Sequence, residues 1–332
     1  MKNNLNIDNI KNIDHKGLLS KLNNSYYKPE IFALVALILL GTVLSFATPY
    51  FLTSRNLINL ARQVSLYAII GFGMTFVIIT GGIDLSVGSV VAVTCTFIAG
   101  FSVKSGLPIW LAVLLGIGVG VLFGVFNGFF VANTKVPAFI ATLGTMSMAS
   151  GTARLYSNGY PITGLPDGFT FIGRGYIGPI PVPVYIMIFV CILMYILLNK
   201  TRFGRYVYGL GDNEETVRLS GVNIRAVKFK VFVLSSFMAA ISGLILCSRL
   251  NSGQPLAGDG WELDAIAVTV VGGTDIAGGR GTIIGTLIGA FIIGMVNNGL
   301  NLLNVSPYLQ LVVKGLVIVG AVFVRAGRIK NN

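Results

Sequence analysis

Long stretches without a single Lys, Arg, Asp or Glu dominate the chain, and they limit its possible folds more than any other feature. These runs lie between Glu30 and Arg55, Arg62 and Asp84, Asp84 and Lys104, Lys104 and Lys135, Lys135 and Arg154, Arg174 and Lys200, Lys230 and Arg249, and Arg280 and Lys314. Most are close to the roughly 20 residues with which a helix crosses about 30 Å of hydrocarbon. We therefore predict an all-α integral membrane protein.

The composition agrees with this prediction. Hydrophobic residues make up 54% of the chain and charged residues only 11%, whereas about a quarter of a soluble protein is charged. A net charge of +12 would suggest nucleic acid as the partner of a soluble domain. Here the basic residues cluster between apolar runs, where they orient a protein in the bilayer. We therefore expect the lipid bilayer, and no nucleic acid, as a partner.

The number of spans depends on one short segment. Only ten uncharged residues lie between Asp264 and Asp275, too few for a straight helix to cross the bilayer. If this segment crosses, both termini and the basic segment 200–230 share one side, as the positive-inside rule requires. We therefore predict about ten transmembrane helices, with the last one carrying Lys314 and ending near Arg325. Lys314 is expected to extend its amine toward the membrane surface, and pairing inside the bundle is the alternative.

The predicted topology divides the chain into three parts. Residues 1–29 form a polar cytoplasmic tail, residues 30–326 form the transmembrane domain, and residues 327–332 form a cytoplasmic C-terminal tail. The longest outer segments are 155–183, which is rich in proline and aromatic residues, and 251–262. These loops either cap the helix bundle or dock a soluble partner.

The segment from Lys200 to Lys230 is the most polar part of the transmembrane domain. It contains seven of the 24 Lys and Arg residues and three of the 12 acidic residues. Asp212 is a candidate N-cap, Glu215 follows three residues later as in a capping box, and Gly221 can end the helix in a left-handed turn. So short a helix needs support from a partner. The alternative is a basic loop that lies on anionic lipid.

A motif occurs twice in the chain. Thr80 to Gly88 (TGGIDLSVG) and Val271 to Gly279 (VGGTDIAGG) share Gly-Gly-x-Asp, and their two Asp residues are 191 positions apart. The topology places both motifs on the cytoplasmic side, so we predict an internal parallel duplication. The repeated residues are Gly81, Gly82 and Asp84, and Gly272, Gly273 and Asp275. Capping of helix ends is the favoured role of these residues, and gating or ion coupling by the two Asp side chains is the alternative.

Several kinds of chemistry have no matching motif. The chain contains no G-x-x-x-x-G-K-[ST] loop, no G-x-S-x-G and no H-E-x-x-H, so we predict neither an enzyme nor a bound nucleotide. The cysteines Cys95, Cys191 and Cys247 lie inside apolar runs, and their odd number and spacing favour neither a disulfide framework nor a metal site.

Uncharged polar side chains inside the spans are candidates for a solute path. Hydroxyls and amides suit a neutral polyhydroxylated solute, although for any single residue the favoured role is to hold two helices together. The main candidates are Thr75, Asn127, Asn297 and Asn298, and further ones are Thr94, Thr96, Asn133, Thr142, Thr145, Asn301 and Gln310.

Taken together, several segments resemble the membrane permease of a bacterial ABC importer of the ribose type. They are Ile78 to Ser89, Ala138 to Leu143, Thr201 to Gly209, Arg218 to Val222, Leu263 to Ala267, Val271 to Gly281 and Gly285 to Leu303. The resemblance implies a location in the bacterial plasma membrane and a path formed by two copies of the chain. It also implies two partners: a cytoplasmic ATPase, usually with two fused nucleotide-binding domains that hold ATP and Mg, and an extracytoplasmic sugar-binding protein.

The resemblance also assigns a role to the polar segment 200–230. It implies that the helix near Asp212 is the coupling helix that contacts the ATPase, through Asp212, Asn213, Glu214, Glu215, Arg218, Leu219, Ser220 and Gly221. Glu214 and residues 218–221 match the ribose-type pattern, whereas Glu215 and Thr216 stand where alanines are usual. Ribose is the sugar that the resemblance favours, and permeases for xylose, arabinose or galactose look similar. The alternatives are a self-sufficient sugar facilitator or ion-coupled carrier, and a structural or regulatory membrane subunit.

Overall fold

The computed structural model describes residues 28–316 and residue 320. Its labelled helices are α2 (Lys28–Ala47), α3 (Ser54–Ile79), α4 (Val87–Val103), α5 (Ile109–Asn133), α6 (Ala138–Ser157), α7 (Phe171–Arg174), α8 (Val182–Lys200), α9 (Arg202–Asp212), α10 (Glu214–Leu219), α11 (Ile224–Leu250), α12 (Trp261–Val271) and α13 (Ile283–Leu302). Residues 307–316 are also helical, and we call them the C-terminal helix. The predicted tails lie outside the described residues except at 28–29, as does the predicted end of the last span near Arg325.

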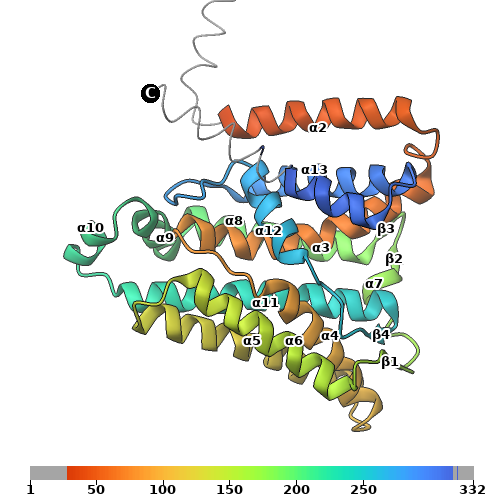
Figure 1. Ribbon diagram of the computed structural model, residues 1–332, viewed down its shortest axis with the longest axis horizontal. Helices are drawn as coiled ribbons and strands as arrows, with labels where there is room; N and C mark the ends of the chain where they lie inside the picture. Colours follow the sequence, from red (N-terminus) through yellow and green to blue (C-terminus); the bar gives the residue numbers. More distant parts are fainter. Residues whose placement is uncertain (1–27, 317–319, 321–332) are drawn as a thin grey trace, which may run out of the picture.

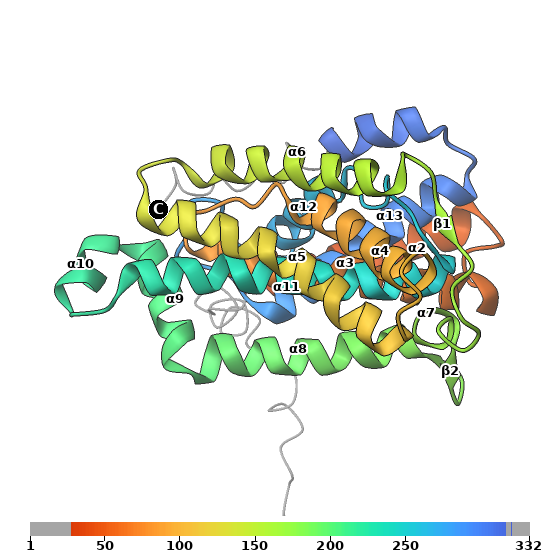
Figure 2. The same ribbon diagram turned by 90° about the horizontal axis from the view of Figure 1, so that it is seen from below.

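The long helices lie side by side along one direction, and most of the short elements lie at the two ends, whereas the short helix α12 lies in the middle (Figures 1 and 2). The short helix α10 projects at one end, which we call the α10 end. At the opposite end, the strand end, β1 (Ile162–Thr163) pairs antiparallel with β4 (Ser252–Gly253), and β2 (Tyr176–Ile177) pairs with β3 (Ile180–Pro181).

Six of the described helices are long and apolar enough to cross a membrane. They are Glu30–Ala47, Ser54–Ile79, Ile109–Asn133, Val182–Lys200, Ile224–Leu250 and Ile283–Leu302. The helix α4 is apolar but shorter, with 17 residues. These helices make the chain a multi-pass membrane protein, whereas the predicted count of ten spans is not confirmed.

The helix α12 is too short to cross the bilayer alone, and α4 is at the lower limit of the length that can cross. With 11 and 17 residues, they are about 16 Å and about 25 Å long at 1.5 Å per residue, against about 30 Å of hydrocarbon. Near the first turn of α4, Gly88 packs directly against Gly258, which lies just before α12. A side-chain carbon added at either glycine would overlap the backbone of the other segment. These two short helices therefore start beside each other inside the molecule and run toward opposite ends.

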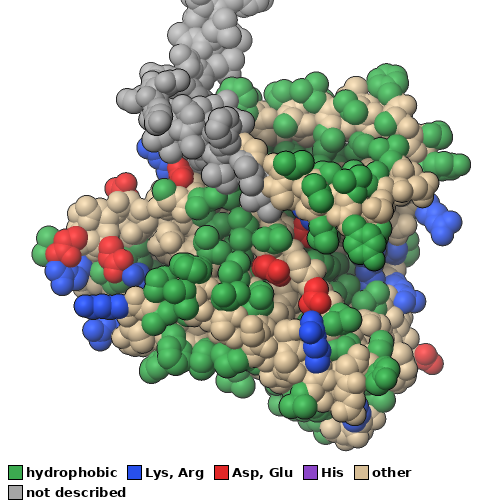
Figure 3. Space-filling model, viewed as in Figure 1, with side chains coloured by type: hydrophobic (Ala, Val, Ile, Leu, Met, Phe, Trp, Pro, Cys, Tyr) green, Lys and Arg blue, Asp and Glu red, His purple; other side chains and the backbone are tan. Residues whose placement is uncertain are grey.

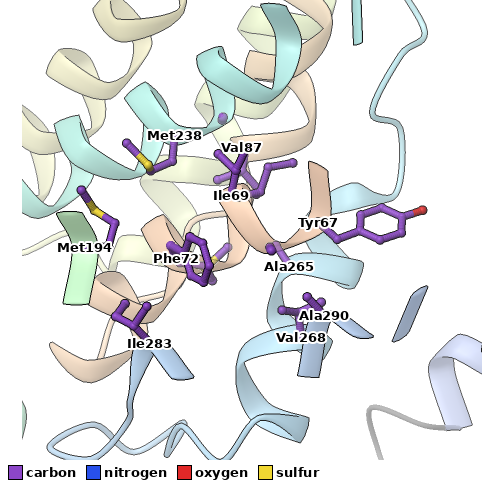
Figure 4. Close-up of a cluster of buried hydrophobic side chains, with 14 of the residues drawn as sticks. Tyr67, Ile69, Phe72, Val87, Met194, Met238, Ala265, Val268, Ile283 and Ala290 are labelled. Carbon is purple, nitrogen blue, oxygen red and sulfur yellow. The ribbon is translucent and has the colours of Figure 1, made fainter. Parts of the chain in front are cut away.

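The helix α3 is the centre of the hydrophobic core. It is buried along most of its length and contacts α8, α11, α12 and α13. Figure 4 shows its side chains Ile69 and Phe72 among Met194, Met238 and Val268 from three of these neighbours. The exposed faces of α2, α5, α6 and α8 are also largely apolar, as expected where the solvent is lipid.

The direction of the helices bears on the predicted duplication. The helices α3 and α5 run toward the α10 end, and α4 between them runs toward the strand end (Figure 1). The helices α11 and α13 run toward the strand end, and α12 between them runs toward the α10 end. Segments related in this way form an inverted repeat rather than a parallel one. The predicted parallel duplication is therefore not confirmed, although the first copy of the repeated motif begins at the α10 end and the second copy lies there.

Candidate functional site

The α10 end carries the predicted coupling helix, which differs from the prediction in its first residue. Asp212 is the last residue of α9, and Asn213 is the N-cap of α10. The Asn213 Oδ1 accepts a hydrogen bond of 3.0 Å from the Thr216 N–H. Gly221 follows the helix with a φ of +78°, the left-handed turn that the sequence predicted. The correction has a simple cause: Asp and Asn are equally good N-caps, and here they are adjacent.

The helix α10 is held by charges and by one partly buried side chain, Val217, which packs against the core beside α9. Lys228 of α11 donates to both carboxylate oxygens of Glu214 at 2.8 Å, which fixes the helix to the start of α11. Glu215 pairs with Arg218 within α10 at 2.5 Å and so does not form the predicted capping box, and this pair raises the pKa of the arginine. No residue of α10 is buried, and Leu219 is 79% exposed. The helix therefore presents one unpacked apolar side chain among charges.

The preceding helix, α9, is packed tightly against the body of the molecule. A side-chain carbon at Gly211 would overlap both the Ile79 carbonyl oxygen at the end of α3 and the backbone of Gly279. The Tyr208 hydroxyl donates to the Gly281 carbonyl oxygen at 2.7 Å. The Gly279 N–H donates to the Ile79 carbonyl oxygen at 2.9 Å. The two copies of the repeated motif thus lie next to each other and next to α9.

The first copy of the motif leads from α3 to α4 through the non-helical segment 80–86, which turns back into the bundle. Asp84 within it is fully buried. The Asp84 Oδ1 accepts from the Ser86 N–H at 3.0 Å and from the Ser86 hydroxyl at 2.6 Å, and its Oδ2 accepts from the Ser235 hydroxyl of α11 at 2.8 Å. Asn127 of α5 donates to the Ser86 hydroxyl at 2.9 Å. Asp84 therefore holds the segment to the surrounding helices.

The second copy of the motif has the same local turn in a different setting. The Asp275 Oδ1 accepts from the Ala277 N–H, two residues on, as Asp84 does from Ser86. Unlike Asp84, it lies in a partly exposed loop at the α10 end. Neither Asp is the N-cap of the next helix, since Ser86 precedes α4 and Thr282 precedes α13. Both nevertheless accept backbone N–H groups in a turn, which resembles the predicted capping.

The glycines of the motif were predicted to end the preceding helices, and the structure agrees in part. Gly272 is the C-cap of α12, whereas Thr80 is the C-cap of α3 and Gly81 follows with a φ of +76°. Gly82 is buried and packs near Phe232, and Gly273 has a φ of +104°.

An open polar groove lies where α4 and α12 begin. Its volume is about 440 Å³, and its lining residues are Ser89, Met146, Ser147, Ser150, Gly151, Arg154, Asp259, Gly260 and Glu262. Arg154 and Asp259 form an exposed ion pair of 3.4 Å along it. Figure 3 shows acidic and basic side chains in the middle of this otherwise largely hydrophobic face. In residues 28–316, no group of three His, Cys, Asp or Glu residues is placed to hold a metal ion.

Comparison with known proteins identifies the family. Residues 56–322 match the family model described as branched-chain amino acid transport system / permease component. The chain belongs to this permease family. No solved structure matches the permease.

The relatives of the permease include three proteins named as ribose import permeases. The one from Bacillus subtilis is 46% identical over 314 residues, which are 94% of each chain. The one from Haemophilus influenzae is 49% identical, covering 87% of this chain and 90% of its own, and the one from Escherichia coli K12 is 46% identical, covering 88% and 92%. These relatives confirm the predicted permease and the prediction that the chain is a transport component and not an enzyme.

The main path candidates predicted from the sequence hold helices of the permease together. Thr75 bonds to Thr286 at 2.6 Å between α3 and α13, and Asn298 exchanges two bonds with Asn56, at 2.7 and 3.0 Å. Asn297 donates to the Tyr67 hydroxyl at 3.4 Å, and Asn127 bonds to Ser86. All four candidates are buried, and none lines the groove. Their role in a solute path therefore stays a prediction.

The further path candidates also bond within the bundle or lie away from the groove. Thr142 accepts from the Leu85 N–H at 3.1 Å, and Gln310 donates to Asn301 at 2.9 Å. Thr94, Thr96 and Thr145 are buried, and Asn133 bonds to the Phe129 carbonyl oxygen of its own helix.

Lys314 pairs inside the permease and does not extend to the surface as expected. Its amine lies 2.9 Å from the Asp264 carboxylate, which is only 1% exposed. The pair joins the C-terminal helix to the first turn of α12. A buried carboxylate needs such a partner in a membrane, and this need outweighs the tendency of a lysine to reach water.

Proposed function

We propose that this permease imports ribose across the bacterial plasma membrane as the membrane component of a binding-protein-dependent ABC importer. The observation that carries the proposal is the 46–49% identity to ribose import permeases over nearly the whole chain. The residues 30–326 are the permease domain, and residues 1–29 and 327–332 are cytoplasmic tails.

The α10 end is the cytoplasmic end in this proposal. Its basic residues are Lys135, Lys200, Arg202, Arg205, Arg218, Arg225, Lys228, Lys230 and Arg280, whereas the strand end has Arg55, Arg62, Lys104, Arg154, Arg174 and Arg249. The excess at the α10 end follows the positive-inside rule. With ten spans, both termini are on this side.

The partners follow from this orientation. A cytoplasmic ATPase, with two fused nucleotide-binding domains, binds at α10, where the exposed Leu219 and the surrounding charges supply the contact. ATP and Mg are held by that partner, and the permease binds no nucleotide. A sugar-binding protein docks on the loops of the strand end, and two copies of the permease enclose the path.

The contacts of α9 explain how movement of α10 reaches the membrane. The end of α9 touches the end of α3 at Ile79 and the loop before α13 at Gly279 and Gly281. Beyond these contacts the chain continues into α4 and α13. Closure of the ATPase on ATP would therefore displace both α4 and α13, and the path would open alternately to the two sides of the membrane. A ligand or partner shifts such an equilibrium only by binding one state better, so the ATPase needs to favour one position of α10.

Reconstituted transport tests the proposal. Proteoliposomes with the permease, the ATPase and ribose-loaded binding protein are expected to accumulate ribose only with ATP. Bulky residues at the coupling turn, Ser220→Trp and Gly221→Trp, are expected to abolish uptake and release the ATPase from the membrane. Phe46→Trp is the control, because Phe46 is exposed near the end of α2, at the strand end and opposite to α10. Full ribose uptake by the permease alone would instead establish a facilitator or an ion-coupled carrier.

A further inference from the structure

The polar groove described above runs from the middle of the bundle toward the strand end, since its α6 lining extends from Met146 to Arg154 in the last turn of that helix. It is formed where the starts of α4 and α12 meet, at Gly88 and Gly258, and each helix leads from there to a different end. The opposite wall is one face of α6, on which Ser147, Ser150, Gly151 and Arg154 recur at the spacing of helical turns. The groove is therefore bounded by three helices that approach from both ends of the molecule.

The side chains of the groove suit a neutral molecule rich in hydroxyl groups. Ser89, Ser147 and Ser150 supply hydroxyls that donate and accept hydrogen bonds, and Glu262 supplies a carboxylate acceptor. The positive charge of Arg154 is paired with Asp259. Glu262 makes no ion pair with any residue in 28–316, so the groove carries a net negative charge and disfavours anionic solutes.

This groove cannot be a lipid-facing surface. An ionised side chain at the centre of a bilayer costs at least about 2.5 kcal/mol, and such groups face a protein interior or a water-filled cavity. The flanking surfaces are apolar and exposed: Phe139, Leu143 and Met148 on α6, and Tyr308, Leu311 and Val312 on the C-terminal helix. Apolar flanks suit lipid as well as protein, so it is the charged groove between them that needs a cover. A second copy of the permease would enclose the groove and leave it accessible along its length.

We propose that this groove is one half of the sugar site in the path, where Ser89, Ser147, Ser150 and Glu262 contact the hydroxyl groups of the transported monosaccharide. The inference rests on the proposed import of a sugar and adds the residues that contact it. The volume of about 440 Å³ lies within the range of about 300–1,000 Å³ that is usual for small-molecule sites. The fully buried cluster around Asp84 is not an alternative site, because its carboxylate oxygens and the hydroxyls of Ser86 and Ser235 are already paired with one another.

Added cysteines test the proposal in the complete importer. The native cysteines Cys95, Cys191 and Cys247 are all buried, so a polar thiol reagent should reach only an introduced cysteine. Labelling of Ser147→Cys or Ser150→Cys in proteoliposomes is expected to lower ATP-dependent ribose uptake by about tenfold or more. A tenfold loss corresponds to a transport barrier that is higher by roughly 1.4 kcal/mol. Excess ribose with cycling ATP should slow the labelling. Thr152→Cys is the matched control, because Thr152 is on the same helix but bonds to the Met148 carbonyl oxygen and does not line the groove.

A second variant examines Glu262 without a reagent. Glu262→Gln keeps the shape and removes the charge, so ribose uptake should fall several-fold while ATP hydrolysis stimulated by the loaded binding protein is retained. Uptake that survives labelling at both serines and survives Glu262→Gln overturns the inference and leaves the proposed function intact. Failure of the unmodified importer to take up ribose with ATP would overturn the proposed function, and with it the inference.

Discussion

At the scale of single residues, Asp84 shows how a carboxylate can be accommodated inside a membrane protein. It accepts hydrogen bonds from the Ser86 N–H and from the hydroxyls of Ser86 and Ser235. The arrangement supports a structural role, in which the side chain fixes the segment between α3 and α4. A role in ion coupling would require the charge itself.

Two substitutions at Asp84 separate these roles. Asp84→Asn keeps an oxygen for Ser86, and the Ser235 hydroxyl can turn to accept from the new amide. We expect it to retain uptake and to lower the free energy of unfolding by no more than about 1 kcal/mol. Asp84→Ala loses all three hydrogen bonds, and we expect a loss of about 3 kcal/mol. Thermal unfolding in detergent and ribose uptake measure the two effects, and loss of uptake with a stable Asp84→Asn protein would favour ion coupling.

The buried pair of Lys314 and Asp264 leads to a second prediction. Lys314→Met removes the cation and leaves the Asp264 carboxylate buried without its ion pair, which we expect to destabilise the fold by about 3–5 kcal/mol. In the double variant Lys314→Met with Asp264→Asn, no charge remains buried, so most of this stability should return. Unfolding of both variants in the same detergent gives the comparison. Equal destabilisation by the single and double variants would show that the pair itself, and not an unpaired charge, determines the loss.

Residue-level prediction from the sequence located the short helix and the turn after it, but it chose the wrong one of two adjacent N-cap residues and failed where packing decides the outcome. The left-handed Gly221 follows from its place after a short helix. By contrast, nothing local distinguishes Asn298, which bonds to Asn56 across 242 positions of the chain, from Ser147, which lines the groove. A signal for the groove was present in the helical spacing of Ser147, Ser150, Gly151 and Arg154, but it indicates only that they share a face.

At the scale of elements, the contact of α9 with α3 and the loop before α13 is the feature on which force transmission depends. Gly211→Val would place a side chain where the Ile79 carbonyl oxygen lies, so α9 must move away. We expect the variant to bind the ATPase and to support ATP hydrolysis, but to transport ribose at least about tenfold more slowly. Gly118→Ala in α5 is the control, because nothing lies within 4 Å of the added carbon. Normal uptake by Gly211→Val would show that movement of α10 reaches the membrane by another route.

Most helices could be predicted from the uncharged runs, because length and lack of charge alone determine where a helix crosses lipid. The ends of the short helices could not. The shortness of α12 was visible as ten uncharged residues, but its place beside the start of α4 depends on the close approach of Gly88 and Gly258. A distant backbone contact of this kind leaves no local pattern.

At the scale of the whole molecule, the apolar surfaces beside the groove predict how two copies meet. In a dimer with twofold symmetry, residues near the axis approach their own counterparts. We expect Leu143→Cys or Met148→Cys on α6 to form a disulfide between copies on mild oxidation. Phe189→Cys on α8 is the control, because Phe189 is even more exposed but lies on a helix outside the groove. Gel electrophoresis without reductant measures the product, and cross-linking only through α8 would place the dimer interface elsewhere.

The sequence predicted the class of the fold, an all-α membrane protein, but not the symmetry that relates its two halves. Two similar motifs on one side suggested a parallel repeat, and both motifs do begin at the α10 end. However, one motif follows the long helix α3 and the other follows the short helix α12. Similar turns can therefore arise at places that are not equivalent in the fold, because a Gly-Gly-x-Asp turn satisfies the same backbone groups in either setting.

The short helix α12 also has a consequence for how the protein is made. With 11 residues and both Glu262 and Asp264 in its first turn, it is a poor substrate for insertion during synthesis, since an acidic residue at the centre of a span is penalised by about 2.5–3.5 kcal/mol. The cation that neutralises Asp264 is 50 positions further along the chain. Newly made α12 therefore has to wait beside the translocation machinery until the C-terminal helix leaves the ribosome, and truncation before Lys314 should yield a chain that quality-control proteases remove.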